Sequence, residues 1–226
     1  MKLVFTFVLF SLFACSSQTE TKTEIKTSAT SEQAIPNLIA MLDTVWRTEQ
    51  EPIRLRDSLG KVFGYESQEF QKEQERYEKN HQVNEKKITD LLEKNGWPSE
   101  DLIGENGNLT ICNVLQHSTM EVRLAYLPMM RAAVKNKKLP ARLLARAEDR
   151  IATDRGELQI YGGQIKYYPE TKTFNVWPIF DPVNVDKRRA AIGLEPMADF
   201  LKNRRFPMEW KLSEQLERTA AFQQKK

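Results

Sequence analysis

Residues 140–156 read PARLLARAEDRIATDRG, and this stretch decides the fold class. Its apolar residues recur at three- and four-residue steps, which places them on one face of a helix: Leu143, Leu144, Ala147 and Ile151. Pro140 suits the first turn of a helix, and Gly156 suits its end. The stretch therefore predicts an amphipathic helix over 140–155 that buries one face.

The same helical period continues upstream through most of the chain. It predicts helices over 35–46, in a short segment after Pro52, and over 67–94, 109–117 and 119–136. Asn95-Gly96 with Pro98 just beyond is the chemistry expected where a helix ends. Pro128 predicts an interruption or a restart within the last of these helices.

Downstream of Gly156 the period changes. Residues 159–168 and 173–177 are rich in β-branched and aromatic residues, and the turn residues between them indicate a β-hairpin. A lone hairpin is marginal in water, so it should pack on the helices. Further helices are predicted over 185–192 and 195–204. The sequence therefore predicts a mainly α (α+β) fold, a helical, bundle-like single domain with one β-hairpin insert.

The N-terminus has the pattern of a secretory signal. Lys2 supplies a positive charge, and residues 3–13 are almost wholly apolar but too short to remain as a membrane span. The tetrapeptide at the end of this run resembles a lipobox, whose cysteine becomes a lipid-bearing N-terminus: Leu12-Phe13-Ala14-Cys15. We therefore expect a signal peptide over 1–14 and a membrane anchor through lipid on Cys15. The alternative is a plain signal peptide with an incidental cysteine.

The rest of the chain divides into three expected parts. Residues 15–33 are rich in Ser, Thr, Glu, Lys and Gln, which predicts a flexible polar tether. Residues 34–205 form the mostly helical domain, and residues 206–226 a peripheral, weakly helical tail. By analogy with lipoprotein sorting, Ser16 and Ser17 lack the aspartate that retains some lipoproteins at the inner membrane. We therefore expect a cell-envelope protein anchored in the outer membrane and facing the periplasm.

Charge and residue usage disfavour several classes of function. Lys and Arg number 34 against 31 Asp and Glu, and no basic stripe with interleaved aromatics occurs, so a nucleic-acid partner is not expected. Cys112 lies in an apolar run, where a small buried hydrophobe is the usual role and a catalytic thiol the alternative. The chain has two histidines, no paired cysteines and no Gly-x-x-x-x-Gly-Lys loop. We therefore expect neither a metal site nor a cofactor.

Several short motifs follow one another in a fixed order between residues 96 and 201. They are Gly96-Trp97-Pro98, Gly104, Gln116-His117, Gln159-x-Tyr161-Gly162-x-Gln164, Trp177-Pro178-Ile179-x-Asp181-Pro182, Val185-Asp186-x-Arg188-Arg189 and Gly193-Leu194-x-Pro196. Upstream stand Trp46-x-x-Glu49-Gln50 and Arg54. This order and spacing resemble the bacterial domain-of-unknown-function family numbered 6624, in which Asp is usual where this chain has Glu49. The resemblance implies a largely helical fold with a small β element, and it implies no activity.

His117 is the leading candidate for chemistry, because histidine exchanges a proton near neutral pH. It follows Gln116 at an expected helix end, where a polar side chain can face a cleft. The alternative is a partly buried histidine bonded to a backbone carbonyl. Glu121 lies four residues on, but the expected helix break between the two disfavours a paired site. His81 is expected on a solvated face of the charged helix.

Gln159, Tyr161 and Gln164 surround a kink at Gly162-Gly163 and are candidate binding residues. In a binding site they would offer donors and acceptors to a polar ligand such as a sugar or a peptide. In a scaffold they would satisfy backbone groups where the hairpin meets the helices. Both interpretations are open at this point.

Asp181, Asp186, Arg188 and Arg189 form the remaining polar cluster. Asp181 before a proline suits a turn, and Asp186 near a helix start complements the helix dipole. In the alternative, Asp181 orients His117, and Arg188 or Arg189 grips an anionic group with its planar guanidinium.

Two functions remain. The first is a binding domain whose partner is an envelope protein, peptide or glycan, with Gln116 and the polar residues between 159 and 189 as its site. The second is a cell-envelope hydrolase with His117 as general acid or base and Asp181 or Glu49 beside it. The absence of a convincing serine or cysteine nucleophile favours the binding domain.

Overall fold

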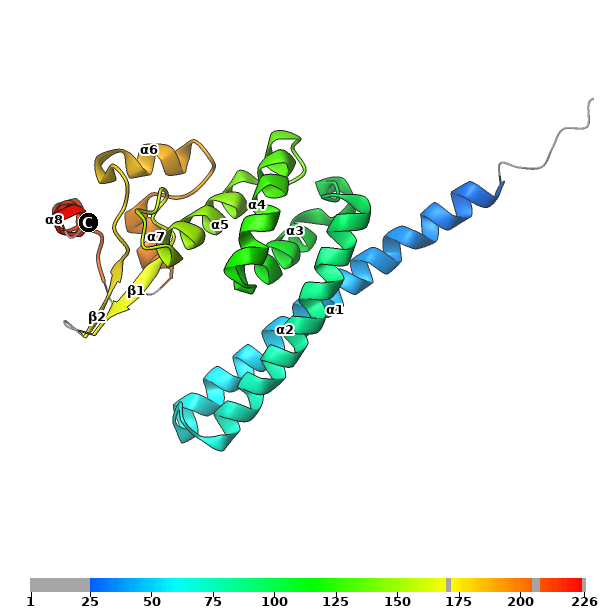
Figure 1. Cartoon of the computed structure of the whole chain (residues 1–226), viewed down its shortest axis with the longest axis horizontal. Helices are drawn as coiled ribbons and strands as arrows, with labels where there is room; N and C mark the ends of the chain where they lie inside the picture. The colour runs from blue at the N-terminus through cyan, green and yellow to red at the C-terminus, as the bar shows by residue number, and fades with distance from the viewer. Residues whose placement is uncertain (1–24, 170–171, 205–207, 225–226) are drawn as a thin grey trace, which may run out of the picture.

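Two long antiparallel helices, α1 (Ile25–Phe63) and α2 (Gln68–Asn95), form a helical hairpin along one side of the molecule (Figure 1). The computed structural model describes residues 25–169, 172–204 and 208–224. The expected signal peptide and lipidated Cys15 therefore lie outside the described residues. Helix α1 begins at Ile25, so the part of the expected tether from residue 25 onward is helical.

The predicted break at Pro52 is wrong, because α1 runs through both Pro36 and Pro52. Proline lacks the N–H that would bond the carbonyl four residues earlier. Here that carbonyl, of Thr48, accepts a hydrogen bond from Asn80 Nδ2 of α2 at 2.9 Å. Packing between α1 and α2 therefore supplies a partner for the group that Pro52 leaves free.

The boundaries of α2 agree with the prediction. Ser67 caps its start, where Oγ accepts from Phe70 N at 3.2 Å. Gly96 ends it with φ 65, and its N–H donates to the Leu92 carbonyl. A left-handed residue of this kind commonly ends a helix, and glycine adopts it without strain.

Three shorter helices follow: α3 (Glu100–His117), α4 (Met120–Lys135) and α5 (Ala141–Asp154). Helix α3 begins earlier than predicted and is kinked at Gly104, where φ is 64. Pro128 lies inside α4 rather than ending it. The predicted helix break between His117 and Glu121 is present, because Ser118 ends α3 and Thr119 caps α4.

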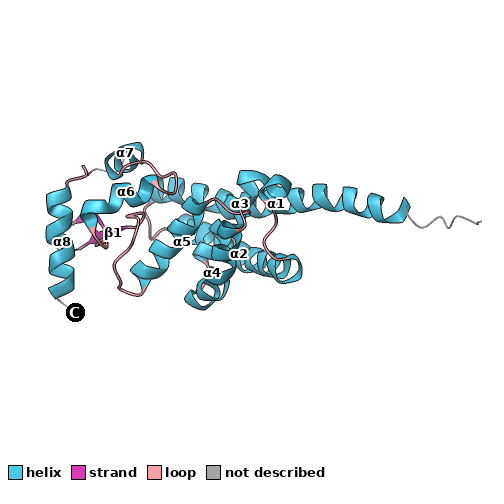
Figure 2. Cartoon of the chain, turned by 90° about the horizontal axis from the view of Figure 1, so that it is seen from above, coloured by secondary structure: helices cyan, strands magenta, loops and turns pink. Residues whose placement is uncertain are grey.

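The first hydrophobic core lies among helices α1 to α5. Its fully buried members come from all five helices and the segments between them: Leu42, Val45, Ile88, Leu92, Trp97, Ile111, Val114, Leu115, Met130, Leu139, Leu143 and Ala147 among others. In the view from above, α1 extends well beyond the helices that pack on it (Figure 2). In the described residues no helix has both the length and the apolar character that crossing a membrane requires.

The C-terminal part contains the predicted hairpin. Strands β1 (Ile165–Tyr168) and β2 (Thr173–Val176) pair antiparallel, with Ile165 opposite Val176. The 3₁₀ helix η1 (Pro182–Asn184) and the helices α6 (Val185–Ala190), α7 (Met197–Asn203) and α8 (Leu212–Gln224) follow. The first strand is shorter than predicted, because residues 159–164 form a loop. The prediction of a mainly α fold with one β-hairpin is confirmed.

A second hydrophobic core joins these elements and contains Val176, Ile179, Val185, Met197, Phe200 and Leu201. Helix α8 closes this part, although the tail was expected to be peripheral. Gln215 and Thr219 on α8 are buried, and Thr219 Oγ1 contacts the backbone N and O of Ile179 at 3.4 and 3.3 Å. Helix α8 thus contacts the rest of this part through two polar residues, which give no apolar stripe in the sequence, and through Phe222, whose ring centroid lies 5.4 Å from that of Trp177.

Candidate functional site

Glu49 of α1 and His81 of α2 form a buried pair. Glu49 is fully buried, and its two carboxylate oxygens lie 3.1 and 3.2 Å from His81 Nδ1. The other ring nitrogen, Nε2, is buried without a hydrogen-bond partner, and Oε2 of Glu85 lies 4.0 Å from it. The expectation that His81 lies on a solvated face is wrong, because α1 covers that face of α2.

Neighbouring side chains fix the Glu49–His81 pair. Asn84 Nδ2 donates to Glu49 Oε1 at 2.9 Å and to Thr48 Oγ1 at 3.0 Å. The Tyr77 ring stacks on His81, with centroids 5.7 Å apart and 28° between the planes. Burial, and then the charge of Glu49, raises the pKa of Tyr77 to about 12, so its phenol stays protonated. The imidazole is therefore held in one orientation.

The charges of Arg150 on α5 and of Glu49 and His81 act on His117, which lies at the end of α3. His117 is exposed at the protein surface, yet desolvation is the largest cause that lowers its pKa to about 4. Repulsion by Arg150 and His81 adds to this lowering, and Glu49 opposes it. At neutral pH the His117 ring is therefore uncharged. Arg150 Nε is buried without a hydrogen bond, 4.0 Å from Asp154 Oδ2.

This arrangement suits proton transfer. A carboxylate on one ring nitrogen fixes the tautomer of a histidine and stabilises its protonated form, so that the other nitrogen can exchange a proton. Glu49 stands in this relation to His81. Within the ranges that the structure describes, no three His, Cys, Asp or Glu side chains are grouped so that they could hold a metal ion.

Asp181 belongs to a turn and does not contact His117. Its Oδ2 accepts from Asn184 Nδ2 at 2.9 Å and from Arg188 Nη1 at 3.4 Å. Between these described residues, no hydrogen bond or ion pair joins Asp181 to His117. Glu49, and not Asp181, is thus the carboxylate that contacts a histidine, and that histidine is His81.

The loop 159–164 is wound around Asp149 of α5. This buried carboxylate accepts three backbone N–H groups, from Ile160 at 2.8 Å, Tyr161 at 2.9 Å and Gly163 at 2.8 Å. The pKa of Asp149 is raised, because the effect of burial outweighs the opposite effect of the three N–H donors. Asp149 therefore ties the first helical core to the loop that leads into the hairpin.

The predicted binding residues Gln159 and Gln164 hold this loop closed. Gln159 Nε2 donates to the carbonyls of Gln164 and Trp177 at 3.0 and 2.8 Å, and its Oε1 accepts from Gln164 N at 2.8 Å. Gly162, with φ 77, packs so closely that an added Cβ would lie 2.7 Å from Met197 Sδ. These contacts favour the scaffold interpretation of the loop.

The remaining candidates also bond to backbone. Asp186 Oδ1 accepts from Met197 N at 2.8 Å. Arg188 donates to the carbonyls of Ile160 and Phe180, and Arg189 donates to the carbonyls of Tyr161 and Glu195. Gln116 is buried at the end of α3, and Cys112 is fully buried with the pKa of its thiol raised by desolvation. A nucleophilic role for Cys112 is therefore disfavoured.

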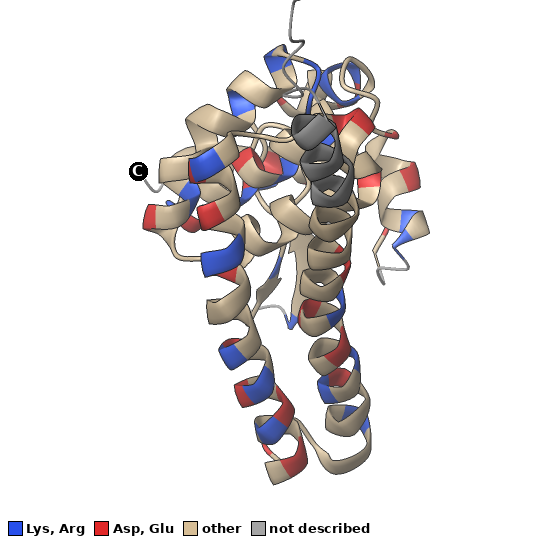
Figure 3. Ribbon diagram, turned by 90° about the vertical axis from the view of Figure 1, so that its right-hand side faces the viewer, with Lys and Arg blue, Asp and Glu red and all other residues tan. Residues whose placement is uncertain are grey.

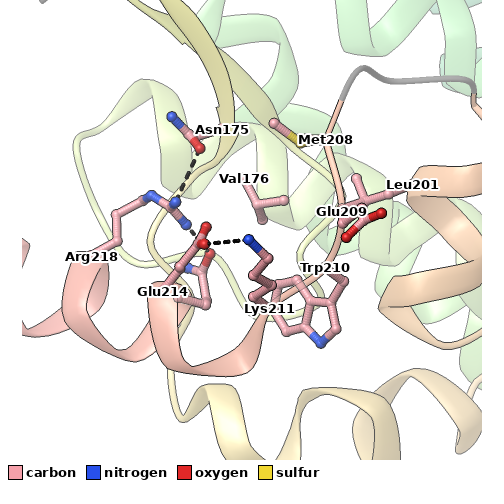
Figure 4. A pocket seen from close by; sticks show the side chains of 10 residues that line it. Asn175, Val176, Leu201, Met208, Glu209, Trp210, Lys211, Glu214 and Arg218 are labelled. Atoms are coloured by element: carbon pink, nitrogen blue, oxygen red, sulfur yellow. Dashed lines mark hydrogen bonds and ion pairs between the residues drawn. The ribbon is translucent and has the colours of Figure 1, made fainter. Parts of the chain in front are cut away.

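A hollow of about 200 Å³ lies where α8 meets β2 and the segment before α8 (Figure 4). Three of its charged groups, Arg218, Lys211 and Glu214, have partners within the hollow. Arg218 donates to Asn175 Oδ1 at 3.0 Å and to Gln215 Oε1 at 2.7 Å, and Lys211 Nζ is 3.0 Å from Glu214 Oε1. The residues around the hollow therefore serve to attach α8, and the hollow is a weaker candidate site than the Glu49–His81 pair.

Sequence reasoning missed the roles of His81, Asn84 and Asp149. A signal was available, because Glu49 follows Leu42 and Val45 at helical spacing, on a face that is otherwise apolar. A charged residue on an apolar stripe is the feature that marks a buried polar contact.

Comparison with known proteins gives one match. A family model described as a family of unknown function (DUF6624) matches residues 77–207, which is more than half of the chain. No curated protein and no solved structure matches the chain. The matched range includes His81, His117, Asp149 and Arg150, and Glu49 lies upstream of it.

Proposed function

The chain belongs to the family of unknown function DUF6624, as its motifs predict, and we propose that it is a lipid-anchored envelope protein with an acid–base active site. The observation that carries the proposal is the buried Glu49 carboxylate on His81 Nδ1, with Nε2 left unpartnered. A buried ion pair adds little to stability, because desolvation offsets the attraction. An unpartnered buried nitrogen costs free energy. Both features are therefore better explained by function than by stability.

His81 is the proposed proton carrier in a hydrolysis. Local opening of the packing around the buried Nε2 admits water. Nε2 then takes a proton from this water as the water oxygen attacks the substrate, and Glu49 stabilises the imidazolium that forms. His81 then gives this proton to the leaving group as the substrate bond breaks. We assign to Arg150, whose charge acts on His117, the role of stabilising negative charge on the attacked group. The lowered pKa of His117 favours a neutral hydrogen-bonding role for it over the expected role of general acid.

Turnover by the mature, full-length protein in detergent tests this proposal. We would screen chromogenic carboxylic esters, phosphate esters, glycosides and peptides, and expect hydrolysis of one class. His81→Ala and Glu49→Gln should each lower kcat a hundredfold or more, since general acid–base help has this size. Gln82→Ala, at an exposed neighbouring position, is the matched control and should keep the wild-type rate. Failure of the wild type to hydrolyse any class, or full activity of His81→Ala, would overturn the proposal.

The anchor is a separate part of the proposal and rests on the lipobox-like tetrapeptide that ends at Cys15. Metabolic labelling with an alkyne fatty acid should mark the wild-type protein and leave Cys15→Ser unmarked. Membrane fractionation should then place the labelled protein in the outer membrane. Equal labelling of the two proteins would contradict lipidation of Cys15. Recovery of the labelled protein in the inner-membrane fraction would contradict anchoring in the outer membrane.

Binding of a partner protein is a second candidate function, favoured by the tip of the α1–α2 hairpin. Val62 and Phe63 there are 72% and 57% exposed, and Tyr65 is also exposed. The 39 residues of α1 span about 60 Å, so this tip lies far from the end of α1 that leads to the proposed anchor. An apolar surface of another protein is therefore a better occupant than the anchoring bilayer.

Site-specific photo-crosslinking in intact cells tests this binding. A crosslinker at position 63 should give a discrete adduct that Val62→Ser abolishes. A crosslinker at position 83, an exposed valine on α2, is the control and should give none. Identical adducts at both positions, or none at position 63, would exclude the tip as a binding surface.

A further inference from the structure

A small pocket of about 70 Å³ lies between α5, the loop 159–164 and helices α6 and α7. Arginines dominate its polar lining: Arg142, Arg146, Arg189 and Arg204. The remaining wall is formed by Ala145, Asp149, Tyr161, Gly163, Leu194 and Phe200. A single water takes about 30 Å³ in the liquid, so the pocket has room for a small polyatomic group.

Arg189 is the buried member of this arginine group. It is 1% exposed, and it donates from Nε to the Glu195 carbonyl at 2.6 Å and from Nη1 to the Tyr161 carbonyl at 2.7 Å. Its third nitrogen, Nη2, is buried and has no hydrogen-bond partner. The guanidinium also lies 4.7 Å from the centroid of the Phe200 ring. A buried arginine with a free donor at a pocket wall is what an anion site requires.

Arg146 and Arg204 add two charges that the protein does not neutralise. Among the described residues, neither guanidinium makes an ion pair or a hydrogen bond, and Arg204 lies 4.9 Å from the Phe200 ring centroid. Desolvation lowers the pKa of Arg146, and the charges of Arg204 and Arg150 lower it further. The two arginines therefore repel one another, and an anion between them would relieve this repulsion. Arg142, by contrast, is paired with Glu105.

Asp149 does not cancel this positive charge by direct pairing. Its two oxygens accept the three N–H groups of the loop 159–164, so its hydrogen-bonding capacity is directed away from the arginines. The charged groups around the pocket are thus Arg146, Arg189 and Arg204 against one occupied carboxylate. Asp186 and Glu195, which lie outside the lining, offset part of the charge of Arg189. The excess of positive charge is therefore centred on Arg146 and Arg204, and a phosphate, with more charge and more acceptor oxygens than a carboxylate, suits it better.

We propose that this pocket binds a phosphate group, which Arg146 and Arg204 grip from two sides while Arg189 Nη2 donates from the buried wall. The group can be inorganic phosphate or the end of an organic phosphate. The site is distinct from the Glu49–His81 pair, although Arg146 and Arg150 lie one turn apart on α5. It does not depend on the proposed catalysis, and a failed activity screen would leave it standing.

Isothermal titration of the mature, full-length protein in detergent tests the site. Inorganic phosphate, glycerol phosphate and acetate would be titrated at constant ionic strength. We expect saturable binding of phosphate, at least tenfold weaker binding of acetate, and a tenfold or greater rise in the phosphate Kd for Arg146→Gln and Arg204→Gln. Arg47→Gln, at an exposed position of α1, is the control and should bind as the wild type does. Tighter binding of glycerol phosphate than of inorganic phosphate would identify an organic ligand.

Three outcomes would overturn the proposal: no saturable phosphate binding, acetate binding as tight as phosphate, or equal losses in all three arginine variants. A second measurement covers variants that fail to fold. Phenylglyoxal modifies accessible arginines, and peptide mass spectrometry of the wild-type protein reports each position. Phosphate should protect Arg146 and Arg204 and leave Arg47 reactive. Equal modification of all three with and without phosphate would count against the site as fully as absent binding.

Discussion

His81 Nδ1 lies 3.1 Å from Glu49 Oε1 across the α1–α2 interface, and this contact joins the two long helices through a buried polar pair. Both helices otherwise carry charges of both signs along their outer length (Figure 3). Surface charges of this kind contribute little to stability and serve solubility. The Glu49–His81 pair differs from them because Glu49 is fully buried and the pair is held between the two helices.

Glu49→Gln should move the ring proton of His81 from one nitrogen to the other. The carboxylate only accepts, so it requires a proton on Nδ1, whereas the glutamine amide can donate to an unprotonated Nδ1. Nitrogen-15 NMR of the histidine rings distinguishes the two tautomers. Glu85→Gln is the matched control, because Glu85 lies 4.0 Å from Nε2 and makes no contact with Nδ1. Identical His81 spectra for the wild type and Glu49→Gln would show that Glu49 does not set the tautomer.

His117 should make the protein less stable as the pH falls. Its folded pKa of about 4 lies below its ordinary value of 6.5, so between these values the unfolded chain binds a proton that the folded chain does not. Its contribution is fully present above pH 6.5 and is lost progressively towards pH 4. Urea unfolding of the wild type and of His117→Gln at pH 7.5 and 4.5 measures it. The difference in unfolding free energy, wild type minus variant, should fall at the lower pH; a constant difference would contradict the lowered pKa.

Most of the fold could be predicted from local sequence patterns, because helix ends and apolar stripes depend on residues that are close together in the sequence. Ser67 and Gly96 bound α2 where cap chemistry predicts, and α5 follows its apolar stripe. Pro52 misled because the partner of the carbonyl it frees, Asn80, lies on another helix. A local reading cannot weigh such a contact against the cost of an internal proline.

The candidate site was harder to predict for the same reason. His117 was identified from its residue type, but Glu49 and His81 meet only because α1 packs against α2. The polar residues near the hairpin were candidate binding residues because of their types and spacing. Their donors and acceptors, as in Gln159, are mostly occupied by backbone, which a sequence pattern does not distinguish from a binding site.

Gly162→Ala should destabilise the protein more than Gly193→Ala does. Both glycines have positive φ, 77 and 75, so alanine at either position strains the backbone by roughly 1 kcal/mol. Only at Gly162 would the new Cβ also meet Met197 Sδ at 2.7 Å, and overpacking of this kind costs about 1–3 kcal/mol more. Gly193 has open space around it. Urea unfolding of both variants gives the comparison, and equal losses would mean that the Met197 side chain moves aside freely.

Asp149→Ala should loosen the loop 159–164, since it orphans three N–H groups at once. An unsatisfied buried donor costs about 1–3 kcal/mol, so the loss should be about 3 kcal/mol or more. The Asp149→Asn variant tests the roles of the two carboxylate oxygens separately. Its single acceptor oxygen can keep Ile160 and Tyr161, which bond the same oxygen Oδ1, while its NH₂ group faces the N–H of Gly163. Hydrogen exchange should therefore quicken at Gly163 and stay slow at the other two amides. Uniform quickening would mean that the loop opens as one unit, and unchanged exchange at all three amides would indicate that Gln159 rather than Asp149 holds the loop.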